Sequence, residues 1–177
     1  MNASAESSVV ALVGNPRRGS RTLAAAEQVA GRLAALLPAA MVTTVDLVTL
    51  GAELFADERP QASAAQRTVA AADLLVVATP VYKASYTGLL KSFLDLYGND
   101  GLAGVVAVPL VVSGSPAHAL VGEVHLRPLL VELGATLPAR ALTVTEADLA
   151  DLDGAVDRWL RHAREPLLRA LGPASQD

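Results

Sequence analysis

Short runs of apolar residues alternate along this chain with longer segments in which apolar residues recur every three or four positions. The short runs are typical of buried strands and the longer segments of amphipathic helices. Strands are predicted over residues 8–13, 41–46, 74–79, 105–112 and 140–145. Helices are predicted over residues 22–37, about 62–72, 87–97, about 119–133 and 153–171. Pro166 is expected to kink or split the last helix, because proline removes a hydrogen bond inside a helix.

This alternation of strand and helix favours an α/β fold with a parallel sheet. The run Leu74-Leu75-Val76-Val77 is continuously apolar, as a central parallel strand should be. Five such units match the flavodoxin-like doubly wound five-stranded parallel sheet, with strand order 2-1-3-4-5 and helices on both faces. We expect residues 1–177 to form a single domain, since that length is typical of one domain.

Composition narrows the class of protein. A hydrophobic fraction of 52% provides enough apolar surface to offset chain entropy, which argues against disorder. A net charge of −4 and an aromatic content of 3% argue against a nucleic-acid partner, which needs a basic face and stacking platforms. The absence of Cys excludes disulfides, thiol redox chemistry and iron–sulfur clusters. Any redox chemistry must therefore belong to a bound cofactor.

We expect neither a secretory signal at the start of the sequence nor a membrane-spanning stretch within it. The start, MNASAESS, is polar, and the longest apolar stretch, residues 105–112, is far shorter than the roughly 20 residues that span a bilayer. We expect a cytoplasmic protein with no membrane partner.

All three tyrosines and both lysines lie between residues 82 and 97. Because the rest of the chain is poor in both types, their concentration directly after an apolar strand indicates a functional surface. Tyr82 and Lys83 suit a flat, partly anionic ligand. Tyr86, Lys91 and Tyr97 are expected to serve the following helix and an oligomer contact.

Three unusual loops follow the first, third and fourth predicted strands, which are neighbours in a 2-1-3-4-5 sheet. Ligands of such sheets bind in the crevice outside the carboxyl ends of these strands, so one shared site is expected. The loops read Gly14-Asn15-Pro16-Arg17-Arg18-Gly19-Ser20-Arg21-Thr22, Thr79-Pro80-Val81-Tyr82-Lys83-Ala84-Ser85-Tyr86 and Ser113-Gly114-Ser115-Pro116-Ala117-His118.

The first loop has the hydroxyls, arginines and following helix start that bind phosphate. A P-loop is disfavoured, because Ser20 replaces the essential Lys and Pro16 removes an amide donor. The dinucleotide pattern fails because Pro16 occupies its middle glycine position, although Asp46 stands where a ribose-binding acid would. A mononucleotide loop of flavodoxin type fits best.

The other two loops suit the ring of such a nucleotide. Backbone groups of 80–82 and 113–115 would contact the ring edge, and Gly114 would allow close approach. FMN has this shape, with a phosphate at one end and a flat tricyclic ring at the other.

At these residues the sequence resembles the NADPH-dependent FMN reductase family, and most closely the members that supply reduced FMN to alkanesulfonate-type monooxygenases. The resemblance spans roughly residues 9–142. It is carried by GNPRRGSRT (14–22), ATPVYKASYTGLLKSFLDL (78–96), PLVVSGSPAHALVG (109–122) and HLRPLLVELGA (125–135).

The resemblance implies an FMN-binding domain with NADPH or NADH as hydride donor. It implies a phosphate site at Arg17, Ser20, Arg21 and Thr22, with Asn15 in the same loop, and a ring site at Pro80, Val81, Tyr82, Lys83, Ser113 and Gly114, with Ser115 and His118 beside it. It also implies a homodimer or homotetramer and a monooxygenase partner. Flavin-transferring members often carry an inserted aromatic residue or His in the fourth helix, which makes a π-type bulge. Here that place reads Gly122-Glu123-Val124-His125, with no aromatic residue.

Hydride transfer from a nicotinamide to a flavin needs no protein nucleophile, so we name no catalytic side chain and no metal ligand. His118 is a candidate for contact with the flavin or the nicotinamide, and His125 for the role of the bulge residue. Two alternatives stay open. One is a flavodoxin-like electron carrier without NAD(P)H activity, and the other is a quinone, azo or chromate reductase with tightly bound FMN.

Overall fold

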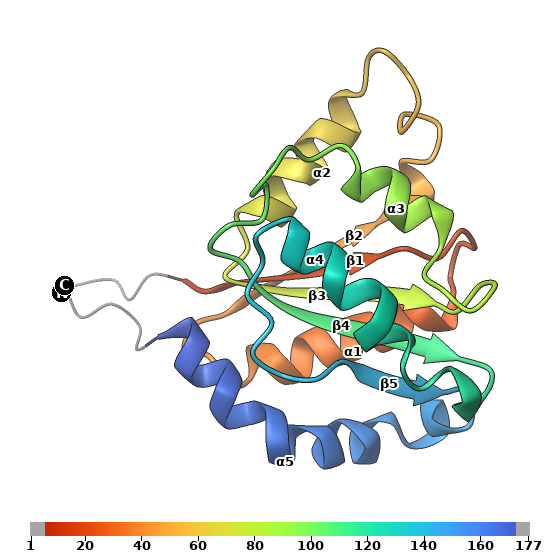
Figure 1. Ribbon diagram of the computed structural model, residues 1–177. Helices are drawn as coiled ribbons and strands as arrows, with labels where there is room; N and C mark the ends of the chain where they lie inside the picture. The colour runs from red at the N-terminus through yellow and green to blue at the C-terminus, as the bar shows by residue number, and fades with distance from the viewer. Residues whose placement is uncertain (1–5, 173–177) are drawn as a thin grey trace, which may run out of the picture.

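The computed structural model describes residues 6–172 and forms a five-stranded parallel sheet with strand order β2-β1-β3-β4-β5. The predicted topology is confirmed, and Figure 1 shows the sheet between two layers of helices. The strands are β1 (Ser8–Val13), β2 (Met41–Asp46), β3 (Leu74–Pro80), β4 (Val106–Ser113) and β5 (Leu142–Thr145). The predicted strand ranges differ from these by no more than two residues at either end.

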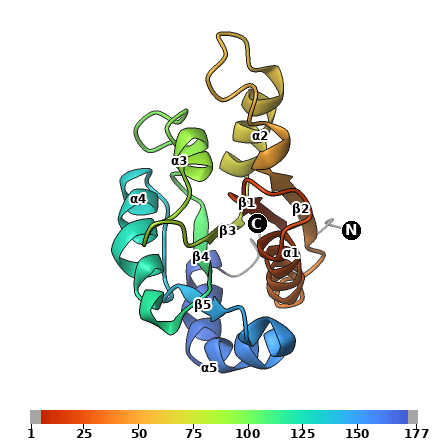
Figure 2. The same ribbon diagram turned by 90° about the vertical axis from the view of Figure 1, so that its right-hand side faces the viewer.

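Helices cover both faces of the sheet, as expected for a doubly wound fold. Figures 1 and 2 show α1 and α5 on one face and α2, α3 and α4 on the other. The helices are α1 (Arg21–Ala34), α2 (Pro60–Ala70), α3 (Gly88–Leu94), α4 (Arg127–Glu132) and α5 (Leu152–Leu171). Short turns lie at η1 (Leu47–Thr49), η2 (Pro116–His118), η3 (Gly122–Leu126) and η4 (Asp148–Asp151).

The alternation of side chains along β1 divides the core between the two faces. Val9, Ala11 and Val13 pack in the cluster under α1 and α5, whereas Val10 and Leu12 pack in the cluster under α2, α3 and α4. All five are fully buried, so a shift of one residue in register would exchange the two sets. This packing fixes where the carboxyl end of β1, and the loop after it, lie.

Four helix predictions need correction. The helix predicted over 22–37 ends at Ala34. The helix predicted over 119–133 is not one α-helix: a π-helix at Gly122–Leu126 precedes a short α4. The helix predicted over 87–97 ends at Leu94. Helix α5 is not split at Pro166, because Val156, Ala163 and Leu167 hold its apolar face in the core on both sides of the proline.

Within residues 6–172, no helix combines the length and apolarity needed to cross a membrane.

Candidate active site

The loops after β1, β3 and β4 meet at one edge of the sheet, as their positions in the sequence predict. Parallel pairing aligns Val13 with Ala78 and Pro80 with Val112. The Gly14 N–H donates to the Ala78 carbonyl at 2.8 Å, and the Val81 N–H donates to the Val112 carbonyl at 3.0 Å. Figure 1 shows the three loops together at the right-hand side, beyond the arrowheads. We call this edge the loop rim.

Asn15 and Thr22 hold the first loop together from inside. The buried Asn15 amide donates to Thr22 Oγ1 at 2.9 Å, and Asn15 Oδ1 accepts the Arg17 N–H at 3.0 Å. Gly19 has a φ of +60°, a left-handed conformation that favours glycine. Of the predicted phosphate ligands, Asn15 and Thr22 therefore act here as supports of the loop.

Helix α1 presents its N-terminus to the loop rim. Ser20 caps the helix by accepting the Leu23 N–H on its Oγ at 3.1 Å. The first turn contains no acidic residue, and the side chains of Arg17 and Arg18 are exposed beside it. A helix N-terminus with nearby guanidinium groups favours an anion.

Arg21, the second of the two predicted arginine ligands, is already paired. Its guanidinium lies 2.6 Å from Glu146 Oε1, a residue that follows β5 and is 125 positions away in the sequence. Both side chains are largely exposed, at 65% and 49%, so the ion pair is weak. An anion that binds Arg21 more tightly can therefore displace Glu146. No local sequence signal identifies Glu146, because the contact is long-range.

Two threonines connect the first and second loops, and the sequence analysis did not single them out. Thr87 Oγ1 donates to the Gly14 carbonyl and accepts the Leu90 N–H at 3.2 Å as the N-cap of α3. Thr79 Oγ1 accepts the Thr87 N–H at 3.2 Å. A Cβ on Gly14 would lie 2.6 Å from the Cβ of Leu90, so glycine is required for α3 to approach this closely. A Thr just before a helical segment is the signal for the cap.

Tyr82 and Lys83 stand on a tight two-residue turn. The Tyr82 N–H donates to the Ser85 carbonyl at 2.9 Å and the Ser85 N–H to the Tyr82 carbonyl at 3.1 Å. Lys83 and Ala84, between them, have φ values of +52° and +61°. Residues other than glycine rarely adopt this left-handed backbone conformation, because it is strained. Backbone strain of this kind concentrates at functional sites. The turn leaves Tyr82 and Lys83 exposed, whereas Pro80 is buried and Val81 half-buried below them.

Ser113 organises the third loop. Its buried Oγ donates to the Ser115 carbonyl at 2.7 Å, accepts the Ser115 N–H at 3.1 Å and lies 3.4 Å from Nδ1 of His118. Gly114, between the two serines, is exposed. The Ser113 side chain is thus used within the loop, and the Gly114 backbone is the part that a ligand can approach.

A hollow of about 210 Å³ continues the loop rim toward η3. It is lined by Ala84, Ala117, His118, Leu120, Val121, Val124 and His125. A larger groove of about 530 Å³ lies between β5, η3 and α5. Among residues 6–172, no group of His, Cys, Asp or Glu side chains is arranged to hold a metal ion.

Tyr97, in contrast, lies away from the rim. Its hydroxyl donates to the Gln66 carbonyl of α2 at 3.0 Å, and its ring meets Phe93 edge-on with centroids 5.9 Å apart. Burial of the phenol raises the pKa of Tyr97 well above its usual value. The tyrosine cluster of the sequence is therefore divided between the rim and the interior.

Comparison with known proteins shows the family of this chain. Residues 7–148 match the model of the family described as NADPH-dependent FMN reductase. The chain is 42% identical over 148 residues to the NADH-dependent FMN reductase SfnE of Pseudomonas putida, covering 81% of this chain and 79% of that protein. It is 37% identical over 145 residues to an FMN reductase (NADPH) of Pseudomonas aeruginosa, covering 79% of this chain and 77% of that protein.

Solved structures show the same fold. The apo form of the NADH:FMN oxidoreductase EMOB is 32% identical, with a TM-score of 0.73 over 97% of both chains. An oxidoreductase from Corynebacterium diphtheriae is 26% identical, with a TM-score of 0.81 over 94% of this chain and 97% of that one. The match to the family covers every loop of the rim. The chain belongs to the NADPH-dependent FMN reductase family.

Proposed function

We propose that this protein transfers a hydride from NADH or NADPH to FMN bound on the loop rim, and that residues 1–177 act as one FMN-binding domain. The observation that carries the proposal is the convergence of the α1 N-terminus, the exposed Tyr82 turn and the Gly114 loop at one sheet edge. This convergence lies inside the segment that matches the family.

The residues present fit FMN. The α1 N-terminus, Ser20 and the arginines at 17 and 21 suit its phosphate, because the first turn of α1 carries no opposing acid. The exposed Gly114 backbone, together with Tyr82 and Lys83, suits a flat ring with polar edges. When bound, FMN supplies the hydride-accepting ring. The chain supplies binding, orientation and electrostatics, and we assign no side chain as acid, base or nucleophile.

We infer that FMN acts as an exchangeable substrate whose reduced form passes to a partner monooxygenase. The support is the π-helix at Gly122–Leu126, which stands where the resemblance places the bulge of flavin-transferring members. Val124 and His125 are exposed on this turn. No aromatic side chain is needed to form it here.

A homo-oligomer is part of the proposal. Three apolar side chains are largely exposed in this part of the chain. Leu120, just before η3, is 60% exposed, Val124 on η3 is 59% exposed, and Val131 on α4 is 55% exposed. Apolar side chains grouped on one surface are typical of a subunit interface. We also propose a cytoplasmic location, in agreement with a chain that has no Cys available for disulfides.

The test is steady-state oxidation of NADH and NADPH under air with FMN, FAD and riboflavin varied in turn. Saturable dependence on FMN is expected, with weaker use of riboflavin because it lacks the phosphate. Turnover that needs a quinone but no added flavin would instead mean tightly bound FMN. If neither nicotinamide is consumed, the reductase proposal is wrong and an electron carrier takes its place.

A further inference from the structure

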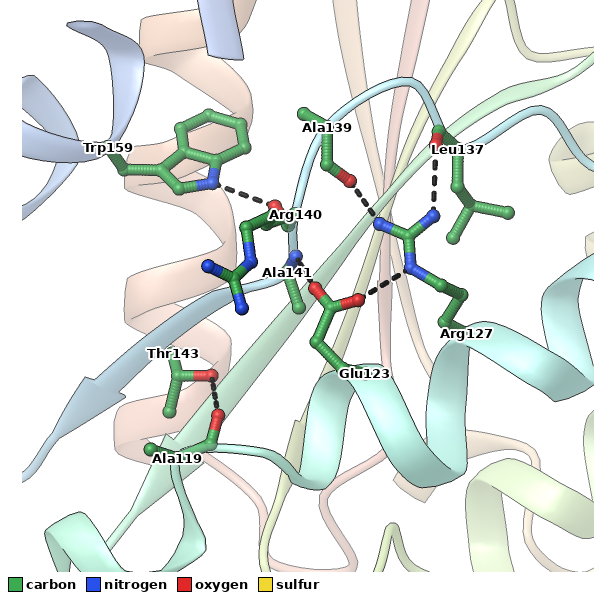
Figure 3. A network of polar contacts seen from close by, with 9 residues as sticks. All are labelled: Ala119, Glu123, Arg127, Leu137, Ala139, Arg140, Ala141, Thr143 and Trp159. Carbon is green, nitrogen blue, oxygen red and sulfur yellow. Dashed lines mark hydrogen bonds and ion pairs between the residues drawn. The ribbon is translucent and has the colours of Figure 1, made fainter. Parts of the chain in front are cut away.

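Two side chains, Glu123 of η3 and Arg127 at the start of α4, hold the segment that leads into β5. Arg127 donates to the Leu137 carbonyl at 2.9 Å and to the Ala139 carbonyl, while Glu123 Oε1 accepts the Ala141 N–H at 2.6 Å. Figure 3 shows both side chains reaching from the helix to this segment. Three backbone groups between 137 and 141 are therefore satisfied by one Glu and one Arg. We call this arrangement the Glu–Arg clamp.

The two side chains are also joined to each other. Arg127 Nε donates to Glu123 Oε2 at 2.7 Å, and the side chains are only 26% and 24% exposed. Burial opposes ionisation of Glu123, but the Ala141 N–H and the Arg127 guanidinium outweigh it and lower the pKa of Glu123 below its usual value. The clamp is thus a charged, partly buried unit, in which removing either partner leaves polar groups unsatisfied.

The wide turn brings both side chains to the segment. The Arg127 N–H bonds to the Gly122 carbonyl, five residues earlier, which is the π-helical pattern. A Cβ on Gly122 would lie 2.5 Å from the Cβ of Ala141 and 3.3 Å from Cγ2 of Val111. Glycine therefore lets the turn lie directly on β4 and on the start of β5, and the clamp holds it there.

The opposite side of the same turn faces the loop rim. The turn follows within four residues of His118, whose loop contains Ser113 and Gly114. Val121, Val124 and His125 line the 210 Å³ hollow together with His118. Movement of the turn would move one wall of the rim, although neither Glu123 nor Arg127 lines that hollow.

We propose that Glu123 and Arg127 are positioning residues of the flavin site: they fix the π-turn against residues 137–141 and so hold the His118 side of the rim in place. The inference rests on the proposed function, because it concerns how the same site binds FMN. It assigns a role to side chains that act through the turn and do not touch the ligand.

The chain contains a matched control for this pair. Glu165 and Arg169 in α5 have the same i,i+4 spacing, with Arg169 Nε 2.9 Å from Glu165 Oε1. They are 69% and 78% exposed. The clamp variants Glu123→Gln and Arg127→Met are therefore compared with Glu165→Gln and Arg169→Met, which remove an ion pair of the same chemistry from the surface.

Two measurements test the clamp. Hydrogen exchange on the free protein should show the amides of residues 119–126 and 141 exchanging about tenfold faster or more in the clamp variants, with the core strands unchanged. In steady-state kinetics the KM for FMN should rise about fivefold or more, while kcat stays within about twofold. The control variants should match the wild type in both measurements.

Arg127→Lys distinguishes the effect of the positive charge from the effect of the hydrogen bonds to the backbone. Lysine keeps the charge, but it lacks the planar guanidinium group that donates to Glu123 and to two carbonyls at once. It should raise the KM for FMN as Arg127→Met does. A wild-type KM in folded Arg127→Lys and Glu123→Gln, or unchanged exchange in 119–126, would overturn the proposal. Failure of the wild type to oxidise NAD(P)H would instead overturn the proposed function, and the exchange data would still decide whether the clamp holds the turn.

Discussion

Lys83 and Ala84 both occupy the left-handed backbone region, with φ values of +52° and +61°, although neither is glycine. Each such residue costs roughly 1–2 kcal/mol relative to an ordinary conformation. The cost is concentrated in the turn that exposes Tyr82 and Lys83 on the loop rim. A turn built from glycine would be easier to form but would carry no side chain at these positions.

Ala84→Gly is expected to raise the free energy of unfolding by up to about 1 kcal/mol, because relief of strain exceeds the added chain entropy. It should also raise the KM for FMN, since the turn becomes more mobile. Urea unfolding and steady-state kinetics measure the two effects. Ala39→Gly is the control: Ala39 has a φ of +50° in the turn before β2, away from the rim, and should give the stability gain alone. A fall in stability for Ala84→Gly would contradict the argument from strain.

The arginines of the first loop differ in their present partners, and this difference predicts different mutational effects. Arg17 is exposed beside the α1 N-terminus, so Arg17→Ala should weaken FMN binding by about 1.5–3 kcal/mol, the range for a charge-assisted hydrogen bond. Arg21 is paired with Glu146, so Glu146→Gln should lower the Kd for FMN by freeing Arg21. Titration of FMN by fluorescence measures both.

The control for Glu146→Gln is the same substitution in an Arg21→Ala background, where it should have no effect on FMN affinity. Its effect on stability should be small in either background, because exposed ion pairs contribute about 1 kcal/mol or less. An unchanged affinity in Arg17→Ala would mean that the phosphate does not bind at this end of α1.

At the scale of elements, the sequence predicts the strands well and the fourth helix poorly. The three central strands, β1, β3 and β4, are buried on both faces, so each is a nearly continuous apolar run that needs no distant partner to be recognised. The hydrogen bonds of the π-helix at Gly122–Leu126 span five residues instead of the four of an α-helix, a difference that the spacing of apolar residues does not resolve. What selects it is the set of bonds from Glu123 and Arg127 to 137–141, and these contacts are long-range.

The same distinction applies to the candidate site. The order of the strands and the three unusual loops predict where the rim lies, because parallel strands end at one edge. They do not predict that the side chains of Asn15, Thr22 and Ser113 bond within their own loops. They also do not reveal Glu146, which reaches Arg21 from beyond β5. Residue types thus indicate the ligand, while the partners of each side chain depend on the assembled fold.

Two carboxylates protect the outer edge of β5, and their titration predicts a pH dependence of stability. Glu123 accepts the Ala141 N–H, and Asp148 Oδ2 accepts the Thr145 N–H at 2.7 Å. For Asp148, the hydrogen bonds from the Thr145 backbone and hydroxyl lower the pKa; the pKa of Glu123 is lowered as well. A carboxyl whose pKa is lower in the folded state than in the unfolded state stabilises the folded protein at pH values above its unfolded pKa. That stabilisation is lost as the pH falls through the pKa of the folded state.

The urea midpoint should therefore fall as pH is lowered below about 4, the range in which free carboxyls titrate. Asp148→Asn keeps an oxygen acceptor for the Thr145 N–H but does not titrate there, so its midpoint should depend less steeply on pH. Asp57→Asn, in the exposed connector before α2, is the control and should keep the wild-type slope. A slope in Asp148→Asn equal to that of the wild type would show that this carboxyl does not contribute.

For the whole molecule, the two faces of η3 and α4 have separate roles. The inner face carries Leu126 and Leu130 into the core and Glu123 and Arg127 to the segment before β5. The outer face exposes Leu120, Val124 and Val131, and it adjoins the hollow that continues the loop rim. If subunits associate through this surface, the partner would lie next to the proposed flavin site on the loop rim, and assembly and FMN binding would be coupled.

Val124→Glu tests that arrangement by placing a charge at the centre of the outer face. We expect the mass in solution to fall toward that of the monomer in sedimentation velocity, because burying an unpaired carboxylate in an interface is strongly unfavourable. The fold should persist, since Val124 is 59% exposed within one chain. Phe55→Ser is the control: Phe55 is 85% exposed in the connector before α2, on a different surface, and its loss should leave the assembly intact. A Val124→Glu protein with the wild-type mass would exclude the outer face of η3 as the interface, whereas loss of assembly in Phe55→Ser would move the interface to the connector.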